Sequence, residues 1–570
     1  MPPPFSDKDL QWMGIKDFSP GIFRYSRVST PLIYTPESPL GSASHSYRCY
    51  SRPGVGLVPF PTHQLAQTHT TGPQSSPVAI SIGDMKSLAG RGGVFGDIVS
   101  NVTTQVGNPA TNVTFALTRK RIDLSTFTPT VVYSNTATSF NPTTTTWQPM
   151  DFGSFQDPTT HAYARCVLAI DPLSITGTTG TWVTVRSYLT PATPADNANG
   201  TFPLIPQNFG TYPRVFYHAY RMGIWQVNSS TTTDGFQASD QDVLSVSDQL
   251  VPTAGASIPA YFTPPNYASF YPEMGTVTGA WGSISTGEYV GIFFEGGAFL
   301  IYGDLYNISS TVKLPGVTGT AGMMWPGSLT PSGMIYCRLN DGAYVWNGDN
   351  VSQKISTQIP DDQFLRTKPP GFEQSSANST SMAVFGQFVV FPNNWTYDTL
   401  TQSWWLIEDP TVLNLQVWCS SPLGLFGSPG YATAATGVSA TLNTYYWSFT
   451  NAVSSYFWLS NPLPITQDAL VSIQLIEIVA SNPTSTAATI TVLPQVPVGQ
   501  RPLQQQNGNQ PLTFTIPANT VAYRGSQRLG YTDYNIQLSI TATNTNSSNA
   551  APILHELNVG YTTTRTAGTQ

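Results

Sequence analysis

The chain has 570 residues, of which 10% are charged, 40% are hydrophobic and 12% are aromatic, so it contains enough apolar material for a core and is not expected to be disordered. Its polar residues are mostly uncharged and it has 47 glycines and 47 prolines, a composition typical of short β-strands joined by many turns. The net charge of −7 divides into 11 − 6 = +5 for residues 1–121 and −12 for residues 122–570, and an acidic body excludes an extended phosphate-binding surface.

The middle of the chain repeats one pattern, a β-rich run, a turn with Gly, Asn or Asp, and a second β-rich run. The earlier copies are irregular, and the later ones are clearer. The copies span residues 166–185, 215–227, 289–302, 334–346, 383–405 and 423–449. Each copy has the form of a β-hairpin, because its turn residues tolerate a positive φ.

The spacing of these copies predicts the architecture. Strands that begin at Val290, Met334, Ala383 and Leu423 are separated by 44, 49 and 40 residues. A period in the forties is typical of β-propeller blades, whose sheets cover one another around an axis. We therefore expect a β-propeller of about six or seven blades over residues 61–462, with a string of unrelated β-sandwich hairpins as the alternative.

The pattern of apolar and polar residues changes near residue 463. Apolar and polar residues alternate in four runs and the chain ends on a fifth strand, which predicts half-buried strands with polar outer faces. The runs are residues 471–476, 489–493, 512–516, 535–540 and 554–561, interrupted by a loop rich in Gln, Gly and Pro at 499–510. The predicted fold class is all-β, a β-propeller followed by a C-terminal β-sandwich over residues 463–570.

Neither metal binding nor a cofactor is predicted. The six histidines have no ligand spacing, and His63 and His69 lie six apart in a loop-like stretch. No Cys-x-x-Cys pair occurs among the four cysteines, which suggest buried free thiols in a reducing compartment. They are Cys49, Cys166, Cys337 and Cys419.

The sequence also favours a protein without enzymatic activity, because the usual motifs of serine hydrolases and nucleotide-dependent enzymes are missing. A glycan-cleaving propeller would need two converging carboxylates. The candidates are Asp240, Asp242, Glu288, Glu295, Asp341, Asp361 and Asp362, several of which are ordinary turn residues. The segment 397–405 is similar to the Asp-box turns of sugar-processing propellers but lacks their glycine, which predicts a structural turn capped by aromatics.

The many aromatic residues are also compatible with carbohydrate binding, because the faces of Trp and Tyr rings stack on sugars. Core packing is the expectation for Trp225, Trp346 and Trp447.

The N-terminus has no apolar signal region and no run of about 18 apolar residues occurs, so neither export nor a membrane span is predicted. Nine Asn-x-Ser/Thr triplets, Asn394 among them, are expected to be unglycosylated.

Three short segments resemble proteins of one class. They are the opening Trp12–Ile22, the run 47–57 that leads through Arg52-Pro53-Gly54, and the hairpin strand 342–348. All three are similar to segments of tail and tail-nozzle proteins of tailed bacteriophages. The resemblance covers the first sixty residues and the blade units.

The resemblance implies a virion protein without catalysis, arranged as a hexameric ring around the tail channel and assembled in the host cytoplasm. DNA would pass through the ring transiently without specific binding. Residues 1–60 would form a docking segment and the first strands, facing a portal or adaptor. Its candidate apolar anchors are Trp12, Ile15, Phe18, Ile22 and Phe23, which could instead complete the first blade. The alternatives are a virion propeller that binds a host-surface glycan or receptor and a glycan-processing enzyme.

Overall fold

The computed structural model describes residues 10–23, 40–70, the strands between 78 and 346, 353–359, 382–421, 424–463, 469–496, 511–533 and 536–565. Between residues 78 and 346 the description concerns mainly the backbone. All regular elements in these ranges are strands, which confirms the predicted all-β class. Within the same ranges, no helix has the length and hydrophobicity of a membrane span.

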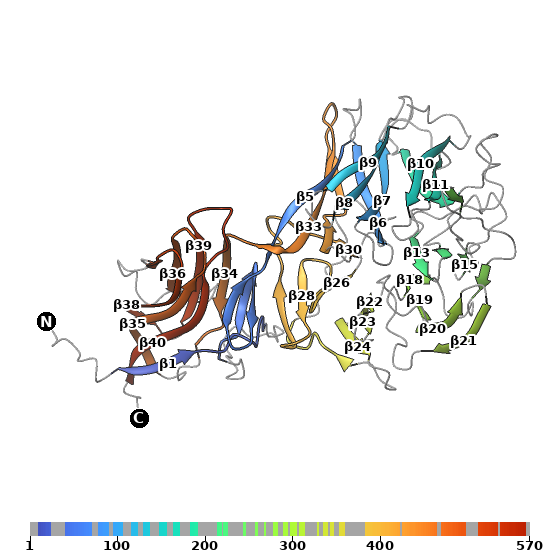
Figure 1. The fold of residues 1–570 in the computed structure, drawn as a ribbon. Helices are drawn as coiled ribbons and strands as arrows, with labels where there is room; N and C mark the ends of the chain where they lie inside the picture. Colours follow the sequence, from blue (N-terminus) through green and yellow to red (C-terminus); the bar gives the residue numbers. More distant parts are fainter. Residues whose placement is uncertain are drawn as a thin grey trace.

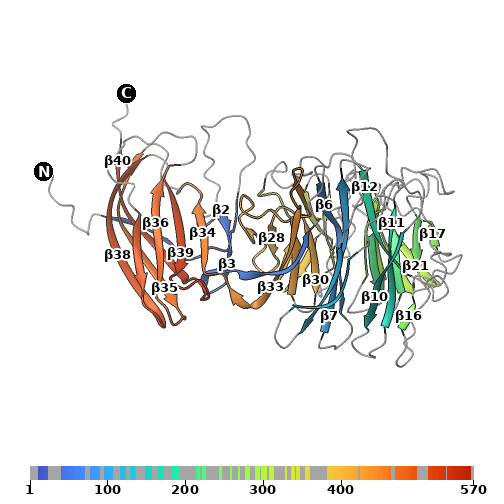
Figure 2. The same ribbon diagram turned by 90° about the horizontal axis from the view of Figure 1, so that it is seen from above.

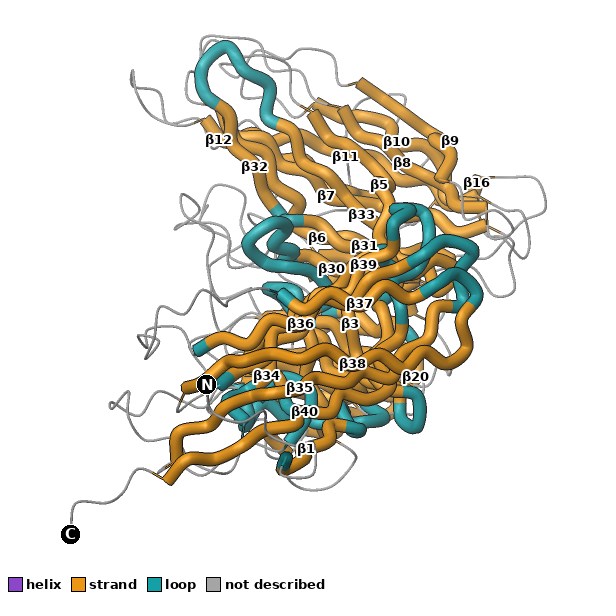
Figure 3. Tube along the Cα trace, turned by 90° about the vertical axis from the view of Figure 1, so that its left-hand side faces the viewer, coloured by secondary structure: helices purple, strands orange, loops and turns teal. Residues whose placement is uncertain are grey.

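The sandwich has two sheets (Figures 1 and 3). The first contains, in order, β3 (Cys49–Arg52), β4 (Gly56–Pro59), β40 (Ile553–Arg565), β35 (Ala469–Asn482) and β38 (Thr520–Asp533), with β1 (Gln11–Ile15) also on β40. The second contains β2 (Ala43–Tyr47), β34 (Ser455–Ser460), β39 (Gln537–Asn544), β36 (Ala488–Gln495) and β37 (Leu512–Ile516). Along β36 every second residue is buried, as expected for a sheet with one face on a core.

Both ends of the chain build this sandwich, whereas the sequence suggested a separate segment 1–60 and a sandwich limited to 463–570. Strands β1 and β4 pair with β40, β2 pairs with β34, and β3 joins its sheet through β4; Ile15, for example, lies opposite Leu557 and Tyr47 opposite Phe457. Local patterns carry no information about partners more than 400 residues away. The strand β38 was also missed, because most of its residues are exposed or half-buried and it contains two glycines.

In most sheets of the propeller part, neighbouring strands are antiparallel and follow one another in the chain. Five of these sheets have four strands each. The first two are β13 (Arg214–His218), β14 (Arg221–Trp225), β15 (Val243–Val246) and β17 (Tyr267–Ser269), and then β18 (Val277–Gly282), β19 (Tyr289–Phe294), β20 (Gly297–Asp304) and β21 (Asn307–Lys313). The other three are β22 (Ser328–Leu329), β23 (Ile335–Leu339), β24 (Gly342–Trp346) and β25 (Gln353–Lys354); β26 (Ala383–Phe385), β27 (Phe388–Val390), β28 (Trp395–Asp398) and β29 (Ser403–Leu406); and β30 (Val417–Ser421), β31 (Gly424–Ser428), β33 (Thr441–Ala452) and β5 (Pro61–Thr70).

A nine-stranded sheet completes this part. It is formed by β6 (Val78–Ala89), β7 (Phe95–Val106), β8 (Ala116–Asp123), β9 (Pro129–Thr136), β10 (Gln148–Gln156), β11 (Tyr163–Asp171), β12 (Val183–Pro191), β16 (Ser257–Pro259) and β32 (Tyr431–Ala434). In Figure 1 the sheets are arranged around a common centre, with the sandwich attached at the rim. The fold is thus a β-propeller with a β-sandwich, and the number of blades stays a prediction.

The repeat was recognised correctly, but three of its four starting points are out of phase. Val290 and the strands that begin next to Met334 and Leu423 are second strands of their sheets, β19, β23 and β31. Only Ala383 begins a first strand, β26. The missed first strands, β18, β22 and β30, are short or rich in small and polar residues, so they carry little β-pattern of their own.

Candidate functional site at the propeller–sandwich junction

The chain crosses between the two parts at two neighbouring points. It enters the propeller from β4 through Phe60 into β5, and it returns from β33 through Val453 into β34. The amide of Val453 donates to the carbonyl of Phe60 at 2.9 Å, and the amide of Phe60 donates to the carbonyl of Arg48 at 2.8 Å. Figure 2 shows the two parts beside each other, with β3 and β33 near the crossing.

The strand β5 also completes the last four-stranded sheet of the propeller, where it lies on β33. A segment from the beginning of the chain therefore closes a sheet whose other strands come from residues 417–452. Such closure covers an edge that would otherwise be exposed. The crossing point and the closing strand are parts of one continuous segment.

The outer edge of β29 is covered by the N-terminal segment of the sandwich. The carbonyl of Trp404 accepts from the amide of Ile22 at 2.7 Å, and that of Leu406 accepts from the amide of Arg48 at 3.0 Å. Close approach depends on Gly21, which has φ +62, and a Cβ there would lie 2.7 Å from the Trp404 carbonyl oxygen. The edge of this propeller sheet is thereby satisfied by the sandwich.

Aromatic packing makes the junction continuous with both cores. The ring of Tyr50, from β3, lies 4.9 Å from that of Phe388 in β27, and the Phe60 ring lies 5.6 Å from Tyr50 and 4.8 Å from Phe388. Trp404 of the propeller and Trp458 of the sandwich belong to one buried hydrophobic cluster. At these aromatic contacts the two parts share a buried apolar cluster.

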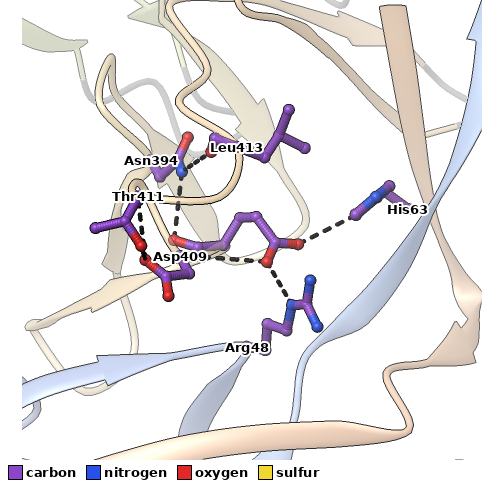
Figure 4. Close-up of polar contacts among 7 residues, drawn as sticks. Arg48, His63, Asn394, Asp409, Thr411 and Leu413 are labelled. Carbon is purple, nitrogen blue, oxygen red and sulfur yellow. Dashed lines mark hydrogen bonds and ion pairs between the residues drawn. The ribbon is translucent and has the colours of Figure 1, made fainter.

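A buried carboxylate lies at the centre of the junction. The side chain of Glu408, two residues after β29, is 1% exposed. Its Oε1 forms an ion pair with the Nε of Arg48, and Nδ1 of His63 lies 3.2 Å from its Oε2 (Figure 4). Arg48 follows β2 and His63 lies in β5, so the carboxylate contacts two segments that are distant from it in sequence.

The environment favours the charged form of Glu408. Burial opposes ionisation and would raise the pKa, but the contact with His63 and the charge and hydrogen bond of Arg48 outweigh it, so that the pKa of the Glu408 carboxyl is lowered from 4.5. The amide of Asp409 also donates to Oε1 at 3.1 Å. The buried charge is paired and hydrogen-bonded, as such a group requires.

The turn between β27 and β28 binds the backbone of Glu408 from the propeller side. Asn393 and Asn394 both have positive φ, at 62° and 67°, which Asn tolerates better than most residues. The side-chain amide of Asn394 donates to the carbonyls of Glu408 and Leu413, and its Oδ1 accepts from the amide of Leu415. Asn394 also begins one of the Asn-x-Ser/Thr triplets. Its side chain is fully buried, so a glycosylating enzyme could not reach it in the folded chain.

The predicted anchors lie in a different place from the one expected. Ile15, Phe18 and Ile22 are at most 1% exposed within this chain, and Phe23 is half-buried. The ring of Phe18 lies 5.5 Å from that of Trp458 in the sandwich, and Ile22 lies on the edge of the propeller strand β29 through its amide. Trp12 remains 47% exposed. Three of the five residues are therefore internal, and a docking role for Trp12 stays a prediction.

Other predicted residues have mixed outcomes. The seven candidate carboxylates lie outside the described residues. Cys49 is a free, buried cysteine, whereas the side chains of the other three cysteines and of His69 are not described. Trp447 is buried, as expected, and the side chains of Trp225 and Trp346 are not described. Among the described residues no group of three or more His, Cys, Asp or Glu is placed to hold a metal ion.

The segment 397–405 forms the structural turn that was predicted. Asp398 accepts hydrogen bonds from the amides of Leu400 and Thr401 and from the side chain of Gln387. Gln402 adopts φ +53, a left-handed conformation that glycine adopts more easily. Trp405 donates to the hydroxyl of Ser403 at 2.9 Å.

No family model and no curated protein matches the chain. Three solved structures are similar to it at low level. An exo-β-1,3-galactanase from Phanerochaete chrysosporium with galactose is 9% identical, with 80% of this chain and 96% of the other covered and a TM-score of 0.24. The extracellular domain of a hybrid two-component system from B. thetaiotaomicron is 8% identical (91% and 62% covered, TM-score 0.30), and BamB from Moraxella catarrhalis is 8% identical (71% and 95%, TM-score 0.23).

These neighbours correct one expectation. The sequence favoured a protein without enzymatic activity, and this is contradicted by a neighbour that is a glycoside hydrolase, so we withdraw it. At a TM-score of 0.24 the likeness transfers no activity, substrate or catalytic residue to this chain.

Proposed function

We propose that the chain is a structural subunit of the tail of a tailed bacteriophage, forming a nozzle or hub ring around the DNA channel. The observation that carries the proposal is the junction, where one buried cluster includes Trp404 of the propeller and Trp458 of the sandwich. A subunit that transmits load through a particle needs its parts held in one relative position. A continuous core provides this, because separating the parts would expose large aromatic side chains to water.

Charge supports the same proposal. Residues 122–570, which include most of the propeller strands and the C-terminal strands of the sandwich, carry a net −12. A channel wall of this sign does not hold DNA by attraction to phosphates, so DNA could pass without being retained. The resemblance of residues 47–57 to nozzle proteins adds to this, since they form the hairpin β3–β4 with its turn at Arg52-Pro53-Gly54-Val55.

The proposed partners are further copies of the same chain in a hexameric ring and a portal or adaptor at one face of the ring. Closed rings of identical subunits use a heterologous contact repeated by rotation. The proposed location is the virion tail, after assembly in the host cytoplasm.

Immunogold labelling of purified phage particles tests the proposal. An antibody against the full chain should label the tail between the head and its tip. Absence of the chain from particles, or label on host-binding fibres alone, would contradict a nozzle or hub. Release of sugar from β-1,3-galactan by the purified chain, in amounts that scale with its concentration, would replace the proposal with a glycan-processing one.

A further inference from the structure

Glu408 is the one described carboxylate that contacts, at the same time, the strand that closes the propeller and the segment that attaches the sandwich. His63 belongs to β5, which lies on β33 in the last propeller sheet. Arg48 belongs to the segment that covers the edge of β29 through its own amide. We propose that Glu408 is an acid-releasable lock that couples closure of the propeller to attachment of the sandwich.

Each contact of the lock comes from a different stretch of chain. Arg48 adopts φ +62, a conformation uncommon for a residue other than glycine, and this places its backbone on β29 while its side chain reaches Glu408. On the propeller side, Asn394 donates to the carbonyl of Glu408 at 3.3 Å. Glu408 is thus held through its side chain by the sandwich and the closing strand, and through its backbone carbonyl by the turn between β27 and β28.

The charged and titratable groups around Glu408 have defined partners. Arg48 provides a permanent positive charge, and His63 provides a ring nitrogen and a charge only when protonated. The carboxylate of Asp409 accepts from the amide and hydroxyl of Thr411. Burial, followed by the charge of Asp409, raises the pKa of the neighbouring Tyr47, which therefore remains neutral over the range in which a carboxyl titrates.

Protonation of Glu408 removes the ionic part of the lock. A protonated carboxyl forms no ion pair with Arg48 and is a weaker acceptor for the hydrogen bonds from Arg48 and from the amide of Asp409. Because the pKa of Glu408 is lowered in the folded chain, its stabilisation is complete above about pH 4.5 and is lost as the pH falls through the lower folded value. The lock therefore opens on the acidic side and stays closed at neutral pH.

Hydrogen exchange of the full chain reports on both functions of the lock separately. The amides of β5 and β33 report on closure, and those of Ile22 and Arg48, which donate to β29, report on attachment. The ladder between β36 and β39 is a reference in the sandwich away from the junction. In Glu408→Gln we expect both sets of junction amides to exchange about tenfold faster or more while the reference is unchanged, a modest factor because Arg48 is 30% exposed.

Glu556→Gln is the control, because Glu556 forms an ion pair with Lys16 at 3.0 Å and accepts from the side-chain amide of Asn558, both within the sandwich. This variant should leave both sets of junction amides unchanged. Acceleration of only one set in Glu408→Gln would overturn the coupling, and equal acceleration in Glu556→Gln would show a general effect of lost charge.

A pH series on the unmodified chain keeps the test independent of the variant. After correction for the intrinsic pH dependence of exchange, both sets should accelerate together below pH 4.5 before the reference does, and Glu408→Gln should lack this step. If Glu408→Gln does not fold, the unmodified chain decides alone, and simultaneous acceleration of all three sets would overturn the lock. The inference rests on the junction geometry and not on the proposed tail function, so failure of either leaves the other to its own test.

Discussion

Replacement of Phe60 by alanine tests the aromatic junction most sharply. Phe60 is fully buried between Tyr50 of the sandwich and Phe388 of the propeller. Its backbone bonds, from its amide to Arg48 and from the amide of Val453 to its carbonyl, do not depend on the side chain. Phe60→Ala therefore removes packing at the crossing point and leaves the hydrogen-bonding groups in place.

The expected loss is large. Truncation of a fully buried Phe to Ala costs about 3–5 kcal/mol, because the transfer free energy of the ring and the energy of the remaining cavity add. Two ring contacts at centroid distances of 5.6 and 4.8 Å are lost with it. A loss of about 3 kcal/mol corresponds to more than 100-fold in the opening equilibrium.

The assay is exchange of the Val453 amide, whose acceptor is the Phe60 carbonyl. A local probe is required because a chain of two bodies does not have a single two-state unfolding free energy. Phe449→Ala is the control: Phe449 is 61% exposed and stacks on Phe385 at 4.0 Å, so its loss should cost about 0.5–1.5 kcal/mol. If Phe60→Ala accelerated exchange at Val453 no more than Phe449→Ala, the packing of Phe60 against Tyr50 and Phe388 would not stabilise the crossing point.

Three further predictions concern single positions. Gly21→Ala should destabilise the pairing of the N-terminal segment with β29 by about 1–2 kcal/mol or more, because φ is +62 and the new Cβ would lie 2.7 Å from the Trp404 carbonyl oxygen. Faster hydrogen exchange of the Ile22 amide would confirm this, and an unchanged rate would contradict the close approach. Asn394→Ala should cost about 1–3 kcal/mol through the orphaned Leu415 amide alone, measured by exchange there, and a neutral result would refute the bonding assigned to this turn. Burial raises the pKa of the Cys49 thiol well above 9.0, so peptide mass spectrometry should find it unalkylated by iodoacetamide at pH 8 until the chain is unfolded, and rapid native labelling would contradict its burial.

Local features were predictable from the sequence because their partners are close in the chain. The hairpins of 383–405 follow the predicted turn at Gly386-Gln387, and β37 has the predicted bounds Leu512–Ile516. The alternation of polar and apolar residues also indicated the strands β35, β36 and β39 correctly. In each case the burial of one face imposes a period of two on the strand itself.

The junction was not predictable in the same way. Arg48 and Glu408 are 360 positions apart, and nothing local to either residue indicates the other. One signal was present: Glu408 directly follows the run Trp404-Trp405-Leu406-Ile407, and an acid at the end of such an apolar run is a candidate for burial with a partner. The apolar pattern of Ile15, Phe18 and Ile22 was recognised, but a pattern does not distinguish a surface for another protein from a surface for the distant end of the same chain.

The mass of the native assembly, measured together with a low-resolution image, tests the proposed ring most directly. The account predicts a closed ring of several copies of the 61.6 kDa chain, each with its sandwich fixed at the rim of its propeller. A monodisperse 61.6 kDa particle at the concentrations reached during assembly would contradict it.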